Sequence, residues 1–182
     1  SRIICISRKR GKMKNDTLLS VKNLKTHFSV GKSIVKAVDG VSFDLEAGKT
    51  FAIVGESGSG KSITALSIMG LLPNNLASTD RGEIIFNNNN LINLEEKEMR
   101  KIRGNNISMI FQEPMTSLNP VYDLSFQISE VITLHQNKNK KEARKIAIEM
   151  LDLVGIPEPQ KRIDSFPHEL SGGMRQRAMI AM

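Results

Sequence analysis

A glycine-rich stretch that ends in lysine and serine carries the most distinctive chemistry in the chain. It fits the phosphate-binding pattern G-x-x-x-x-G-K-[ST] without a mismatch. Glycines let the backbone turn sharply and bring successive N–H groups within reach of phosphate oxygens. The lysine is expected to reach the β- and γ-phosphates of a nucleotide, and the serine hydroxyl to complete the shell of a Mg²⁺ ion. The stretch consists of Gly55, Glu56, Ser57, Gly58, Ser59, Gly60, Lys61 and Ser62.

The segments on either side of this loop supply the context that the motif needs. Residues 50–54 are apolar and partly β-branched, which predicts a buried strand. After the loop, apolar residues recur at helical spacing between Ile63 and Leu72, and Pro73 predicts the end of that helix. A helix that begins at Lys61 adds unpaired N–H donors and the positive end of its dipole. The alternative is a glycine-rich turn that meets the pattern by chance.

The composition is typical of a soluble globular protein. The chain has 182 residues, of which 40% are hydrophobic and 25% are charged. No apolar run approaches the roughly 20 residues that span a bilayer, so any association with a membrane is expected to be peripheral. The single cysteine, Cys5, excludes an internal disulfide and is consistent with a reducing compartment.

The net charge of +7 is concentrated at the start of the chain. The first dozen residues contain no acid and hold several cations, namely Arg2, Arg8, Lys9, Arg10 and Lys12. We interpret residues 1–12 as a non-native or disordered basic leader and residues 13–182 as the domain. The alternative is that this basic leader is an arm that binds nucleic acid. We favour the first interpretation and therefore expect no direct contact with nucleic acid.

The first part of the domain alternates strand-like runs with turn signals. Short strands are predicted at residues 19–24, 34–38 and 41–45, with turns at residues 31–33, 39–40 and 47–49. This pattern predicts a small antiparallel sheet laid against a mixed core. Phe28 lies in this region, and the sequence leaves open whether it stacks on an adenine ring or packs in the core.

The middle of the chain returns to an α/β pattern. It predicts a strand at residues 83–86, a turn at 87–90, a charged helix with a solvated face at 95–103, and a buried strand at 107–111. Pro114 ends that last strand, which places Gln112 at its carboxyl end. Open α/β sheets bind ligands at this edge, so Gln112 is a candidate ligand of Mg²⁺ or of water.

From Leu124 to Val154 the apolar period becomes helical, and Gly155 caps the end of this region. Asp152 falls on the polar side and is interpreted as a surface residue. A second glycine motif follows at Leu170-Ser171-Gly172-Gly173, where Ser171 is a good N-cap for a helix. Bare glycine amides at a helix N-terminus make a second candidate anion site.

The two motifs together resemble the ATP-binding subunits of ABC transporters, in which Leu-Ser-Gly-Gly is the family signature. Residues 111–120 and 166–177 resemble more narrowly the subgroup that energises bacterial dipeptide, oligopeptide and nickel importers. The resemblance covers roughly residues 15–182. It implies an α/β P-loop NTPase core with an antiparallel β subdomain and a helical subdomain at about residues 113–168, and with the C-terminal part of the core missing.

The resemblance also implies roles for individual residues. The loop at residues 55–62 would hold the phosphates of ATP together with Mg²⁺. Gln112 would sense Mg²⁺ and communicate with transmembrane permease subunits, on which the helical subdomain would dock at the cytoplasmic face of the bacterial cell membrane. Phe28 would stack on adenine, with His27 as the neighbouring candidate. The signature residues Ser171, Gly172, Gly173 and Gln176 would contact ATP held by a second ATP-binding subunit in a homo- or heterodimer.

The family pattern continues beyond Met182 with an apolar strand ending in Asp-Glu, a D-loop and a switch histidine. The resemblance therefore implies no identifiable catalytic residue within these 182 residues. The carboxylate that would polarise the attacking water belongs to this missing part, so we expect this chain alone to hydrolyse ATP negligibly. The apolar strand would also pair beside the phosphate-loop strand, so we expect the chain alone to be marginally stable. Two other functions stay open: a non-transport ABC-type ATPase, and a nucleotide-binding fragment without turnover. The compact spacing of the two motifs favours transport.

Overall fold

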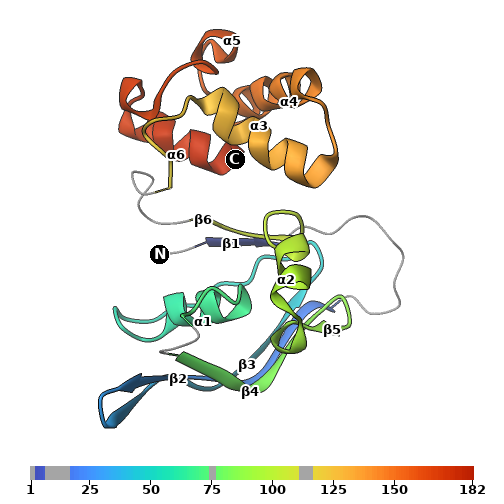
Figure 1. Ribbon diagram of the computed structural model, residues 1–182. Coiled ribbons are helices and arrows are strands. Elements are labelled where there is room, and N and C mark those ends of the chain that lie inside the picture. The colour runs from blue at the N-terminus through green and yellow to red at the C-terminus, as the bar shows by residue number, and fades with distance from the viewer. Residues whose placement is uncertain (1–2, 7–16, 74–76, 111–116) are drawn as a thin grey trace. The chain divides into compact units, whose positions relative to one another are not determined.

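The computed structural model describes residues 3–6, 17–73, 77–110 and 117–182 (Figure 1). These residues fall into two compact units. The unit Ile6–Ser108, here called the sheet unit, holds the phosphate loop. The unit formed by Met109–Met182 with Ser1–Cys5, here called the helical unit, holds the signature motif. Within the described ranges, no helix combines the length and the hydropathy needed to cross a bilayer.

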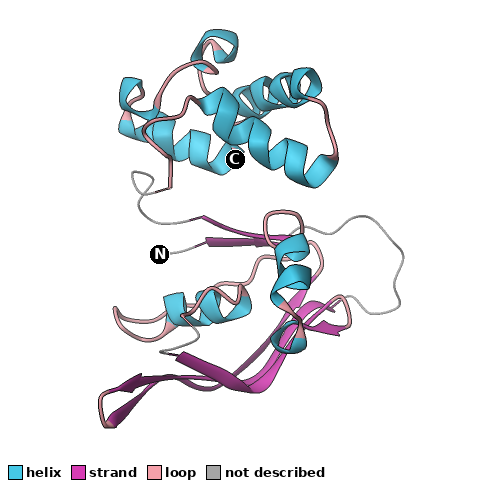
Figure 2. Ribbon diagram, in the orientation of Figure 1, coloured by secondary structure: helices cyan, strands magenta, loops and turns pink. Residues whose placement is uncertain are grey.

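The sheet unit is built on a long antiparallel hairpin. Its strands are β2 (Thr17–Val30) and β3 (Ser33–Glu46), joined by a turn at Gly31 with φ of 60°. The other edge of β2 pairs with β4 (Ala77–Phe86), and β4 pairs with the short β5 (Asn89–Asn90), which gives the order β3-β2-β4-β5. Figure 2 shows the strands in magenta. The predicted antiparallel sheet is therefore confirmed.

The prediction of a turn at residues 39–40 was wrong, because β3 runs through them without a break. Gly40 has φ of 84° and lies near Asn23 of β2, which has φ of 48°. The pairing of β2 with β3 shifts register between Val21 and Leu24. A glycine in a strand can mark either a bulge or a chain reversal, and here it marks an irregularity inside the hairpin.

The prediction of a buried strand at residues 50–54 was also wrong. These residues adopt no regular structure, and the exposed fractions of Phe51, Ile53 and Val54 are 47%, 44% and 92%. A strand needs a hydrogen-bonded neighbour, and none of the described strands pairs with this segment. The segment packs instead through Phe51, whose ring stacks on Phe43 with centroids 4.7 Å apart.

Two helices complete the sheet unit. As predicted, α1 (Lys61–Ile68) begins at the end of the phosphate loop and ends before Pro73. It is joined to β2 by a buried hydrogen bond of 2.8 Å between the hydroxyls of Thr26 and Ser67. The predicted charged helix is α2 (Glu96–Ile102), preceded by the 3₁₀ turn η1 (Leu91–Asn93). Arg103 was predicted to lie on the solvated face of the charged helix, but its side chain is largely buried.

The predicted strand at residues 107–111 is β6 (Ile107–Ile110), which pairs with β1 (Ile3–Ile6) in a separate two-stranded sheet. Ile107 is the one fully buried residue of β6. Residues 87–88 form the predicted turn, with positive φ at both asparagines, whereas residues 89–90 belong to β5. Gln112 lies outside the described residues, so its predicted position is not tested.

The helical unit contains α3 (Leu124–Gln136), α4 (Lys140–Leu153), α5 (Pro159–Arg162), the 3₁₀ turn η3 (Pro167–Glu169) and α6 (Gly172–Ala181). As predicted, α4 buries one apolar face, Gly155 follows it with φ of 74°, and Asp152 is exposed. The core of the helical unit is made of Leu118, Leu124, Ile128, Ile132, Ala143, Ala147, Leu151, Ile156, Ile163, Leu170 and Ala178.

A bidentate ion pair ties α4 to the segment after α5. Arg144 donates from both terminal nitrogens to Asp164, at 2.6 and 2.7 Å, and also to the Ser125 hydroxyl of α3 at 2.8 Å. The hydrogen bonds between Arg144 and Asp164 lower the pKa of Asp164 and raise that of Arg144. One side chain thus connects three segments around the core of the helical unit.

Candidate functional site

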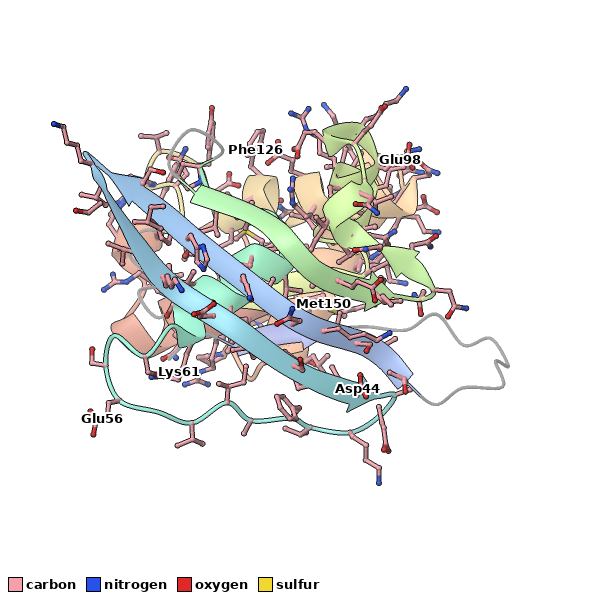
Figure 3. The ribbon with its side chains drawn as sticks, turned by 90° about the horizontal axis from the view of Figure 1, so that it is seen from below. Asp44, Glu56, Lys61, Glu98, Phe126 and Met150 are labelled. Atoms are coloured by element: carbon pink, nitrogen blue, oxygen red, sulfur yellow. The ribbon has the colours of Figure 1, made fainter. Side chains whose placement is uncertain are left out.

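The phosphate loop leads directly from an exposed segment into α1. Gly58 and Gly60 have φ of 83° and 85°, in the left-handed region that favours glycine. The Ser59 amide donates to the Glu56 carbonyl at 3.3 Å, which closes a tight turn within the loop. Figure 3 shows Glu56 and Lys61 on this loop, beyond the edge of the hairpin.

Both end glycines of the loop have close neighbours, and the neighbour of Gly60 is a backbone atom that cannot rotate away. A Cβ added at Gly60 would lie 2.4 Å from the Ala37 carbonyl oxygen of β3. A Cβ added at Gly55 would lie 2.6 Å from the Ser59 hydroxyl. The loop therefore packs against the hairpin at one end and folds over itself at the other.

The Lys61 ammonium lies across the loop that precedes it. It donates to the carbonyl oxygens of Gly55 at 2.6 Å and Glu56 at 2.5 Å, and to the Ser59 hydroxyl at 3.1 Å. An ammonium has three donors and no acceptor, so these contacts match its full capacity. The lysine thus stabilises the curvature of the loop and places a positive charge at its centre.

The N-terminus of α1 is open to an anion. Gly60 is its N-cap residue, no side chain caps the helix, and its first turn contains no acid. The first N–H groups of a helix have no partner within the helix, and the dipole makes this end positive. Ser62 is exposed on the first turn. Amides, an ammonium and a hydroxyl form a donor set that fits a phosphate group, with Ser62 as an oxygen ligand for Mg²⁺.

The predicted adenine-stacking residue, Phe28, is half-buried on β2 opposite Val35. Its neighbour His27 is also half-buried, and its Nε2 lies 3.7 Å from a carboxylate oxygen of Asp39. Both are in the sheet unit, as is the loop. The stacking role of Phe28 stays a prediction.

The signature motif is arranged as a second helix N-terminus. The Ser171 hydroxyl accepts a hydrogen bond from the Met174 amide at 3.3 Å, so the predicted N-cap of α6 is confirmed. Ser171, Gly172 and Gly173 are exposed, and so is Gln176. A Cβ at either glycine would have no heavy atom within 4 Å. The motif is therefore presented on an open surface.

Arg175, which was not predicted as a site residue, holds the segment before the signature helix in place. Its Nη1 donates to the carbonyls of Leu170 at 2.9 Å and Pro167 at 3.3 Å, just before Ser171. A cation near a helix N-terminus opposes the dipole, so an arginine at this position signals that it has acceptors elsewhere. This electrostatic mismatch was the feature of the sequence that could have identified Arg175 as a structural residue of the motif.

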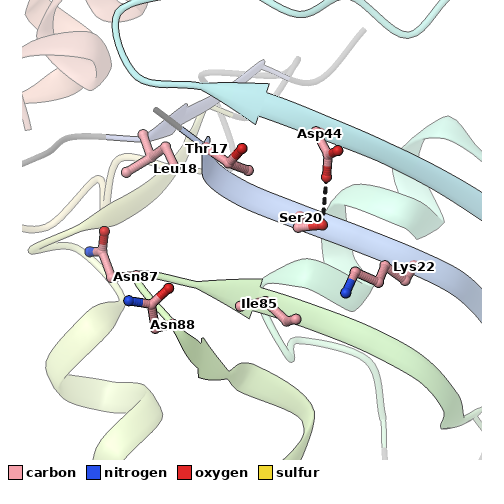
Figure 4. A pocket seen from close by; sticks show the side chains of 8 residues that line it. All are labelled: Thr17, Leu18, Ser20, Lys22, Asp44, Ile85, Asn87 and Asn88. Atoms are coloured by element: carbon pink, nitrogen blue, oxygen red, sulfur yellow. Dashed lines mark hydrogen bonds between the residues drawn. The ribbon is translucent and has the colours of Figure 1, made fainter. Parts of the chain in front are cut away.

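A cavity of about 240 Å³ lies elsewhere in the sheet unit (Figure 4). Two of its polar groups are paired with each other, since the Ser20 hydroxyl donates to Asp44 at 2.5 Å, and Lys22 pairs with Glu83 outside the lining at 3.4 Å. No predicted site residue lines it. The lining consists of Thr17, Leu18, Ser20, Lys22, Asp44, Ile85, Asn87 and Asn88.

Comparisons with known proteins relate the chain to one family. Residues 38–182 match the family described as ABC transporter. The chain is 53% identical to the probable peptide ABC transporter ATP-binding protein y4tR of Sinorhizobium fredii, over 93% of this chain and 50% of that protein. It is 54% identical to the dipeptide transport ATP-binding protein DppD of Bacillus subtilis, over 92% of this chain and 50% of that protein. The chain thus spans about half the length of these relatives.

A solved structure extends the comparison to the fold. The dimeric ATP-binding cassette MJ0796, described as a post-hydrolysis state bound to ADP and Pi, superposes with a TM-score of 0.75 at 27% identity. The match covers 90% of this chain and 67% of that one. The predicted ATP-binding-cassette fold is confirmed by this likeness, with the antiparallel sheet and the helices described above.

Proposed function

The chain belongs to the ABC transporter family of ATP-binding proteins, and we propose that its residues 55–62 bind the triphosphate of ATP. The observation that carries this proposal is the uncapped N-terminus of α1 beside the Lys61 ammonium. Both supply positive potential and hydrogen-bond donors at one place. A nucleoside triphosphate has the phosphate oxygens to engage both the helix N-terminus and the ammonium.

Each residue of the loop has a distinct task in this proposal. The backbone amides donate to phosphate oxygens, and Lys61 exchanges its loop carbonyls for the more negative oxygens of the phosphates. The Ser62 hydroxyl, and Gln112 from beyond the described ranges, act as ligands of Mg²⁺, which neutralises phosphate charge when it is bound. Phe28 contacts the adenine ring.

We propose further that the whole protein is the ATP-hydrolysing subunit of a bacterial importer of peptides or of a related solute such as nickel. The names of the relatives support peptide transport, and they favour it over a non-transport ATPase acting on DNA or the ribosome. In this proposal the protein works at the cytoplasmic face of the membrane, docked on permease subunits. Its exposed signature residues face the ATP of a second ATP-binding subunit.

The first test is binding of MgATP to the purified chain. We expect saturable binding at one site in a calorimetric titration, with Mg²⁺ increasing the affinity because it offsets the charge of the phosphates. Circular dichroism of the same sample establishes that the chain is folded. A folded chain that takes up no nucleotide would reject the proposal.

The signature role is tested by placing charge at Gly172. In the whole protein, Gly172→Asp is expected to weaken ATP-dependent dimerisation about tenfold or more, because a carboxylate would face the γ-phosphate of the partner's ATP. Binding of ATP to the monomer should not change, since a side chain at Gly172 meets open space. Sedimentation velocity with MgATP measures the dimer.

Gly172→Asn is the matched control, because asparagine has nearly the same size without the charge. We expect it to dimerise better than the aspartate variant. If Gly172→Asp dimerised as well as the parent protein, the cross-subunit role of the signature motif would be rejected.

A further inference from the structure

We propose that Arg103 is a positioning residue of the phosphate site. Its Nε donates to the Met69 carbonyl at 2.7 Å, and its Nη2 donates to the Gly70 carbonyl at 2.8 Å. These carbonyls lie at the C-terminal end of α1, whose other end carries the phosphate loop. The inference rests on the function proposed above for residues 55–62, to which it adds a residue outside the loop.

The C-terminal end of α1 is capped by its own backbone but carries no basic residue of its own. The Leu71 amide donates to the Leu66 carbonyl at 3.0 Å, and the Gly70 amide donates to the Ser67 carbonyl at 3.1 Å. This is a Schellman ending, in which Gly70 has φ of 59°. The last turn of α1 contains no basic residue. Arg103 therefore supplies the positive charge that complements the negative end of the helix dipole.

The guanidinium of Arg103 is itself held firmly. Its Nη1 donates to a carboxylate oxygen of Glu96 at 2.7 Å, and the side chain is only 18% exposed. Hydrogen bonds from Arg103 and then from Arg100 lower the pKa of Glu96. A Cβ on Gly70 would lie 3.0 Å from the Arg103 Nη2. Glycine at this position leaves the room that the guanidinium occupies.

Three contacts help to position α1 within the sheet unit, in addition to the packing of its buried face. Gly60 rests against the Ala37 carbonyl at the start of the helix, the hydroxyls of Thr26 and Ser67 meet beside its last turn, and Arg103 holds its end. Releasing the end would let the helix tilt about the remaining contacts. Its N-terminal amides would then move away from the phosphates, and such donors act only when they are held in position.

The test compares Arg103→Ala and Arg103→Lys with Arg100→Ala in the purified chain. Arg100 also donates to Glu96, at 3.1 Å, but it is 76% exposed, so its variant removes the same charge without releasing α1. We expect Arg103→Ala to raise the dissociation constant of MgATP about fivefold to tenfold. Arg103→Lys should show a smaller increase, because an ammonium can satisfy part of the carbonyl set, and Arg100→Ala should bind like the parent chain.

Hydrogen exchange separates positioning from general stability. In Arg103→Ala, protection should fall in α1 while the amides of β2 and β3 keep the protection of the parent chain. An equal fall in all three elements, or unchanged binding in a folded Arg103→Ala variant, would overturn the proposal. Should Arg103→Ala fail to fold, Arg103→Lys decides in the same way. A parent chain that binds no MgATP rejects the function of residues 55–62 itself, which is measured before any variant.

Discussion

Replacing Lys61 by alanine is expected to raise the dissociation constant of MgATP by about 10- to 100-fold. The ammonium lies at the centre of the loop, where it contacts Gly55, Glu56 and Ser59, and no other side-chain cation of the described residues is recorded in contact with these groups. Charge-assisted hydrogen bonds to phosphate are stronger than those between neutral groups. Their loss should therefore weaken binding strongly, although the amides of the loop and of α1 still donate to the phosphates.

The folded state should tolerate this change. The contacts of Lys61 are exposed to solvent, so their loss is expected to lower the free energy of unfolding by about 1 kcal/mol or less. Lys97→Ala is the matched control, because it removes the same charge from an exposed position on α2. Titration calorimetry and urea unfolding of both variants measure the two effects separately. Equal nucleotide affinity in Lys61→Ala and Lys97→Ala would contradict the role of Lys61.

Features encoded by short stretches of sequence could be predicted. The start of α1 at Lys61 follows from its own loop and helical pattern, and the cap at Ser171 follows from a hydroxyl just before a helical run. Both depend on contacts within one turn of the chain. The exposed position of Gly172 was likewise implied by the resemblance to a family whose signature contacts a second subunit.

Features that depend on distant partners could not be predicted. Residues 50–54 have the composition of a strand, but whether they form one depends on pairing with another segment. Gly40 could not be assigned to a turn or a bulge without the register of β2. Arg103 was interpreted as solvated because its acceptors, the carbonyls of Met69 and Gly70, lie 34 and 33 residues earlier in the chain.

The second large effect is expected at Gly60, where alanine should lower the free energy of unfolding by about 2–4 kcal/mol. A left-handed residue with a Cβ is strained by about 1–2 kcal/mol, and at φ of 85° this cost applies here. The new Cβ would also lie 2.4 Å from the Ala37 carbonyl oxygen, so α1 and β3 must separate. This second cost follows from packing, and it displaces the amides that face the phosphates.

Gly58→Ala distinguishes these two costs. Gly58 has φ of 83°, almost the same as Gly60, but a Cβ there has no heavy atom within 4 Å. We expect Gly58→Ala to lose only the conformational part, about 1–2 kcal/mol, in urea unfolding. If both variants lost the same free energy, contact with Ala37 would not hold the loop in place. A larger loss at Gly60, together with weaker MgATP binding, would mean that the backbone contact with Ala37 is one of the ways in which the hairpin supports the phosphate site.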